Sequence, residues 1–62
     1  MSLSTTEQIQ TATRQHVTTM LDEVRGMLRS PDAEWTAIAE TLALTADYVR
    51  GQIEASRRAM HE

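Results

Sequence analysis

Apolar residues recur at helical spacing along the whole chain, and no stretch alternates in the way that a β-strand requires. Ser4-Thr5-Thr6-Glu7 matches a capping box, in which a serine hydroxyl and a glutamate three residues later satisfy the first amides of a helix. The pattern therefore predicts a long first helix over about residues 5–29. Its apolar stripe consists of Val17, Met20, Leu21, Val24, Met27 and Leu28.

The pair Ser30-Pro31 is the strongest break in the pattern. Proline disfavours helical geometry at the residue before it and suits the first position of a new helix, so Ser30 is the expected N-cap. A second helix is predicted over 31–43. Its buried side is expected to comprise Trp35, Ile38, Ala39 and Leu42.

A third helix is predicted over 46–60, with Thr45 as its cap and Asp47 in its first turn. Leu44 and Val49 have the spacing of a hydrophobic staple across that cap. The prediction is thus an all-α chain, 1–62, forming a single domain of three helices. An apolar seam of the third helix alternates spacings of three and four: Ala46, Val49, Ile53, Ser56 and Met60.

A chain of 62 residues builds only a marginal core, and small domains of this kind are usually supported by disulfides, a metal or self-association. Cysteine is absent and the two histidines have no metal-motif spacing, so we expect no metal and no cofactor. The first helix would span roughly 37 Å, longer than either following helix. A homodimer is expected to cover the overhang, through an interface of Ile9, Ala12, His16, Val17, Met20 and Val24.

The segment Trp35–Ile53, WTAIAETLALTADYVRGQI, resembles the helix-turn-helix of Cro-type repressors and of the fourth region of bacterial sigma factors. The resemblance rests on hydrophobic spacing: Ile38, Ala39 and Leu42 would face inward from the first helix of the pair, and Val49 and Ile53 from the second. One position departs from the pattern, because the turn residue that is usually glycine is alanine at position 43.

This resemblance implies a small homodimeric DNA-binding transcriptional regulator of a bacterium or phage. Its second helix would enter the major groove of double-stranded DNA, with Arg50 as a base reader and two further arginines as phosphate contacts. The DNA-binding residues it implies are Thr45, Ala46, Asp47, Tyr48, Arg50, Gly51, Arg57 and Arg58.

The distribution of charge leaves a second hypothesis open. Acids and arginines balance in residues 1–30, so the whole net charge of −3 falls in residues 31–62, the half that resembles a DNA reader. Affinity for DNA depends chiefly on basic residues that neutralise phosphates. The alternative function is a helical homo-oligomeric protein-interaction module, an adaptor that binds another protein and no DNA.

Composition argues against two further classes. No set of side chains has the spacing of a catalytic group, and so short a helical chain offers little room for a water-excluding pocket, so we expect no enzyme activity. No apolar run approaches the roughly 20 residues of a membrane span, and no secretory leader is evident. We therefore expect a cytoplasmic protein with no membrane partner.

Overall fold

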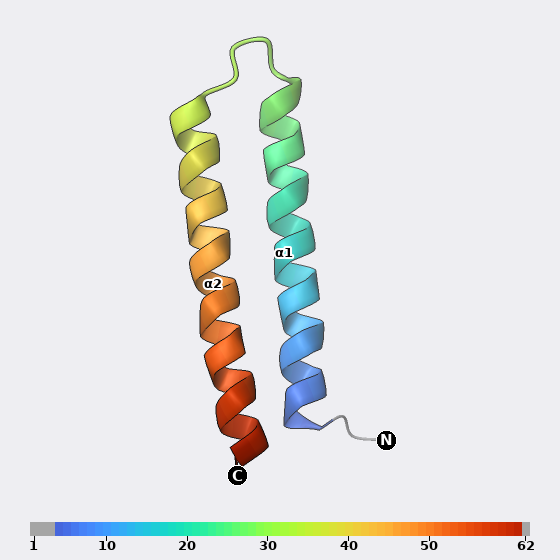
Figure 1. Cartoon of the computed structure of the whole chain (residues 1–62). Helices are drawn as coiled ribbons and strands as arrows, with labels where there is room; N and C mark the ends of the chain where they lie inside the picture. Colours follow the sequence, from blue (N-terminus) through green and yellow to red (C-terminus); the bar gives the residue numbers. More distant parts are fainter. Residues whose placement is uncertain (1–3, 62) are drawn as a thin grey trace.

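A computed structural model describes residues 4–61 as two antiparallel helices (Figure 1). Helix α1 comprises Thr5–Arg29 and helix α2 comprises Trp35–His61. Because the helices are antiparallel, the start of α1 and the end of α2 lie at the same end of the hairpin. The all-α prediction is confirmed, whereas the prediction of three helices is wrong. Over these residues, neither helix has the combination of length and apolarity that a membrane crossing needs.

The start of α1 follows the predicted capping box. Ser4 has extended backbone geometry, and its hydroxyl oxygen accepts a hydrogen bond from the Glu7 amide at 3.2 Å. The same hydroxyl donates to the Glu7 carboxylate at 3.2 Å, so the two side chains are joined as well. The cap satisfies one of the amides that have no partner in the first turn, and α1 spans the predicted residues 5–29.

The connection between the helices is longer than predicted. Ser30 is extended, as expected before proline, but its hydroxyl accepts from the Asp32 amide at 3.3 Å and closes a turn instead of capping a helix. Glu34 takes the capping role: its carboxylate accepts from the Thr36 amide at 3.3 Å and its carbonyl from the Ile38 amide at 3.1 Å. Helix α2 therefore begins at Trp35 and not at residue 31.

No turn interrupts α2 between residues 43 and 46, where the sequence predicted one. The Thr45 hydroxyl, expected to cap a new helix, donates to the Thr41 carbonyl at 2.7 Å and lies within a continuous helix. Ala43 and Leu44 are strong helix formers, and no glycine or proline occurs between Trp35 and Arg50. The separate helices 31–43 and 46–60 are thus one helix.

Replacing Ala43 by glycine tests this continuity. Ala43 is exposed, so the substitution removes little packing. Glycine in a helix interior costs about 1 kcal/mol against alanine, and we expect the free energy of unfolding to fall by that amount. In a helix-turn-helix, glycine at the turn would leave stability unchanged or raise it. Urea denaturation followed by circular dichroism distinguishes a loss from a gain.

The hairpin is a flat, open layer with a small core. Its Cα extents are 48 × 23 × 7 Å and its radius of gyration is 14.8 Å, against about 10.6 Å for a compact domain of this length. Its accessible surface of 5108 Å² exceeds the roughly 4,000 Å² expected for a compact monomer of 7.0 kDa. Among the described residues, only Val24 and Ile38 are buried hydrophobic residues.

The centre of the interface between α1 and α2 is polar. The Gln52 side-chain amide donates to the Thr13 hydroxyl and to the Tyr48 hydroxyl, both at 3.2 Å. The His16 and Tyr48 rings are tilted by 31°, with centroids 3.8 Å apart. These contacts fix the register of the helices but bury little apolar area, so they leave most of the large hydrophobic side chains without cover inside the hairpin.

Candidate interaction surface

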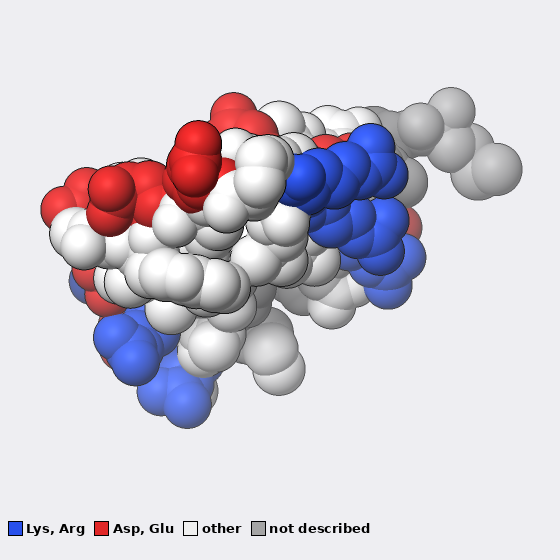
Figure 2. Space-filling model, turned by 90° about the horizontal axis from the view of Figure 1, so that it is seen from above, with Lys and Arg blue, Asp and Glu red and all other residues white. Residues whose placement is uncertain are grey.

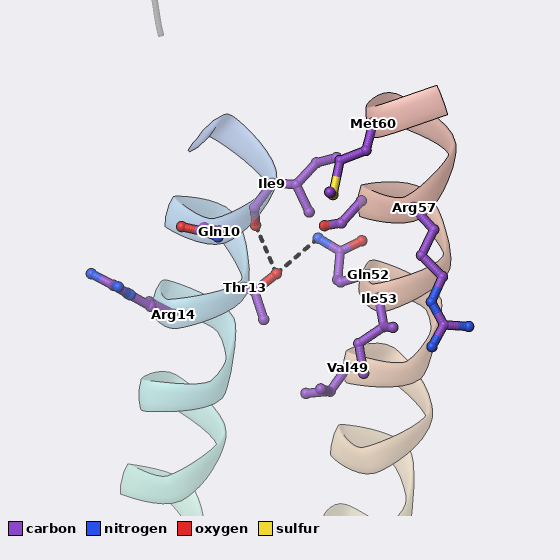
Figure 3. Close-up of a pocket in the computed structure, with 10 residues that line it drawn as sticks. Ile9, Gln10, Thr13, Arg14, Val49, Gln52, Ile53, Arg57 and Met60 are labelled. Atoms are coloured by element: carbon purple, nitrogen blue, oxygen red, sulfur yellow. Dashed lines mark hydrogen bonds between the residues drawn. The ribbon is translucent and has the colours of Figure 1, made fainter. Parts of the chain in front are cut away.

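A shallow groove of about 400 Å³ opens on one side of the hairpin, near the free ends of the helices (Figure 3). Helix α2 contributes six of the ten lining residues, of which Val49, Ile53 and Met60 are apolar. Arg14 and Arg57 belong to the lining on opposite helices. The hydrogen bond between Gln52 and Thr13 runs between the two helices. The lining residues are Ile9, Gln10, Thr13, Arg14, Val49, Gln52, Ile53, Ser56, Arg57 and Met60.

The groove is the end of a longer apolar surface. Residues seven apart in a helix return to nearly the same side, because seven residues make about two turns. Arg14 therefore shares a side of α1 with Leu21 and Leu28, and Val49 shares a side of α2 with Leu42 and Trp35. We define the apolar face as Val17, Leu21 and Leu28 of α1 with Trp35, Ala39, Leu42, Ala46, Val49, Ile53, Ser56 and Met60 of α2.

Large hydrophobic side chains are exposed on this face. Trp35 is 66% exposed and Met60 is 76% exposed, and the leucines and isoleucine between them are close to half exposed. Of the large exposed hydrophobic residues in the described part of the chain, all except Leu44 belong to the apolar face. Scattered exposed hydrophobic residues are ordinary on protein surfaces, whereas large contiguous apolar patches are typical of interaction sites.

Charged residues border most of the apolar face, and Arg14 continues the α1 row of Leu21 and Leu28 at the groove end. Seen from above, the uncharged surface lies between two groups of arginines, and most acidic side chains gather on the opposite side of the hairpin (Figure 2). Helical spacing places Arg25 on the α1 border and Arg50 and Arg57 on the α2 border. Arg50 also pairs with Asp47 at 3.1 Å, but both side chains are exposed, so the pair contributes little stability.

The residues predicted to bind DNA do not share one surface. Thr45 is buried against α1, and Tyr48 is half-buried beside His16. Asp47 and Arg50 are paired with each other on the outer side of α2. The remaining residues of that set are exposed and lie on several sides of the helix: Ala46, Gly51, Arg57 and Arg58.

Five of the six residues predicted to form a dimer interface are buried or half-buried within the hairpin itself. Val24 is buried and Ile9, Val17 and Met20 are half-buried, as is His16 of the stacked pair. Ala12, in contrast, is exposed. The expected overhang of the first helix does not exist, because the continuous α2 is 27 residues long and α1 is 25. A covering copy is not needed at that end of α1.

The sequence did contain a signal for the apolar face. The seam noted from Ala46 to Met60 extends without a break to Leu42, Ala39 and Trp35 if α2 is read as one helix. With the predicted turn at residue 43, Leu42 belongs to the inner side of a separate second helix. The seam is then divided between two helices. Spacings of four and three residues over the whole of α2 predict a helix with a packing partner on that side.

The chemistry of this surface suits binding. The polar groups that line the groove are two hydroxyls, two amides and two guanidinium groups. The side chains of residues 4–61 include no group of three or more histidines, aspartates or glutamates placed to hold a metal ion. Comparisons of the chain with protein-family models, with curated proteins and with solved structures find no match.

Proposed function

We propose that this chain is a helical homo-oligomeric protein-interaction module, and that it associates with copies of itself through the apolar face. The observation that carries the proposal is the exposure of Trp35, Leu42 and Ile53 on one side of a hairpin that buries only two apolar residues among those described. Covering these side chains supplies the apolar burial that the single hairpin lacks.

The amount of available surface supports association. A specific interface buries on the order of 800 Å² on each partner. A flat layer of 48 × 23 Å offers at least that much on one side, and its thickness of only 7 Å leaves no second layer of its own over the apolar face. Helices of small domains reach stability by packing into bundles of this kind.

DNA binding stays a prediction from the sequence, and the geometry supports it less well. Its basis was a helix-turn-helix pair, and residues 35–53 lie in one helix in which Thr45 faces α1. Fluorescence anisotropy with a random duplex library, for wild type and Arg50→Ala, tests it directly. Specific binding that is lost in Arg50→Ala would favour the regulator, whereas the interaction module predicts no sequence-specific binding by either protein.

Sedimentation equilibrium of the full chain tests the proposed self-association. We expect a mass that is a multiple of 7.0 kDa at tens of micromolar chain. Leu42→Glu should return the mass to that of a monomer, because a carboxylate in an apolar interface leaves an unpaired buried charge. Leu44→Glu is the matched control, since Leu44 belongs to the same helix but lies outside the apolar face. A wild-type monomer under these conditions would refute the proposal.

A further inference from the structure

Two hairpins can stack through their apolar faces in different orientations, and the spacing, size and charge of the residues on and beside that face bear on the choice between them. Its seam alternates steps of four and three residues from Trp35 to Met60, a pattern that reads the same from either end. A symmetric pair of such seams is therefore self-complementary when the two helices run in opposite directions.

We propose that the occupant of the apolar face is a second copy whose α2 lies antiparallel to the first α2, with the two loops at opposite ends of a four-helix bundle. The proposal rests on the proposed self-association and adds the orientation and the pairing. The symmetry axis passes close to Asp47 and Tyr48, at the middle of the seam.

Side-chain size supports this register. About that axis, Trp35 of one chain faces Met60 of the other, and Leu42 faces Ile53, so the large exposed residues of the α2 seam cover one another. The smaller residues coincide as well, because Ala39 then faces Ser56. Facing layers of matched size fill the space between helices without large voids.

Charge also favours the antiparallel pairing over the stacking that puts both loops at one end. The contacts of Thr13 with Gln52 and of His16 with Tyr48 show that Arg14 and Arg50 lie at the same level of the hairpin. Stacking with the loops together would set α1 against the partner's α2 and so bring these two arginines face to face. Such like-charge contacts are unfavourable.

The antiparallel arrangement separates those arginines and creates an opposite-charge contact. Arg50 then borders the partner's Ala43, and α1 packs on the α1 of the other chain. Glu7 and Arg25 lie on the same side of α1, because the step of 18 positions from one to the other makes about five turns. Reversal of one chain brings Glu7 near Arg25 of its partner twice in the dimer, a pairing that contributes to specificity.

Disulfide formation between two single-cysteine variants tests the orientation, and the natural chain has no cysteine to interfere. Ala39→Cys and Ser56→Cys are mixed at equal amounts and oxidised in air. We expect a covalent dimer containing one chain of each variant, because the facing positions bring the two thiols within reach. Neither variant alone should form a covalent dimer, since neither residue faces its own copy in the antiparallel pair.

Two other cross-linking results would identify the competing orientations. A covalent dimer from Ala39→Cys alone would show parallel α2 helices, and one from Leu21→Cys with Leu42→Cys would show stacking with both loops at one end. Either result, with the dimer mass retained, would overturn the orientation and leave the proposed self-association intact. A monomeric mass of the unmodified chain, with no cross-linking in any mixture, would instead refute the self-association itself.

Discussion

Replacing Leu42 by glutamate is expected to lower the free energy of unfolding by about 3–5 kcal/mol, because it would place an uncompensated charge in an apolar interface. In an isolated hairpin Leu42 is 46% exposed, and a polar replacement at such a surface position changes stability by only about 0.5 kcal/mol. Urea denaturation at one fixed chain concentration separates these two magnitudes. The large effect is therefore a signature of a covered face.

Leu44→Glu provides the reference for that measurement. It introduces the same side chain into the same helix, two residues away, at a position 70% exposed and outside the apolar face. We expect a change within about 0.5 kcal/mol. Equal losses from the two substitutions would mean that the charge disturbs α2 itself, and the covered face would then have no support from the stability of Leu42→Glu.

Truncation of Ile38 is expected to cost about 2–5 kcal/mol, the range for removing most of a buried aliphatic side chain. Ile38 is 5% exposed and is one of the two buried hydrophobic residues among those described, so its loss leaves a cavity between α1 and α2. The measurement is the unfolding free energy of Ile38→Ala from urea denaturation. Unlike Leu42→Glu, this variant should keep the oligomeric mass of wild type wherever it remains folded.

Leu44→Ala, at an exposed position of the same helix, serves as the comparison for Ile38→Ala. Its expected cost is below about 1 kcal/mol, because few contacts are removed. If Ile38→Ala lowered the free energy of unfolding as little as Leu44→Ala, the two helices would not pack through the interface that contains Ile38, Thr45 and Tyr48.

Much of the fold could be predicted from local signals in the sequence. The capping box at Ser4 and the proline at position 31 gave the limits of α1 correctly, since both act through nearby backbone groups. The break at Ala43 was wrong for an equally local reason. A threonine with an acidic residue two positions later is typical of a helix start, but the Thr45 hydroxyl found an acceptor within the helix instead.

The site was harder to predict because it depends on which apolar stripe faces which partner. Helix α2 carries two adjacent stripes, one through Ile38, Thr45 and Gln52 and one through Leu42 and Ile53. Hydrophobicity alone favours burial of the second stripe. The hairpin buries the first, more polar stripe, in which Gln52 bonds to Thr13 and Tyr48. Such pairwise fit between helices cannot be read from periodicity.

Thermal unfolding at several chain concentrations tests most directly whether the hairpin needs a second copy over its apolar face. If folding and association are coupled, dilution destabilises the folded state, and a hundredfold dilution should lower the Tm by about 10 °C. Circular dichroism at 222 nm follows the helices over that range. A Tm that falls in this way is the predicted result, and a Tm that is independent of concentration would contradict a stabilising partner copy.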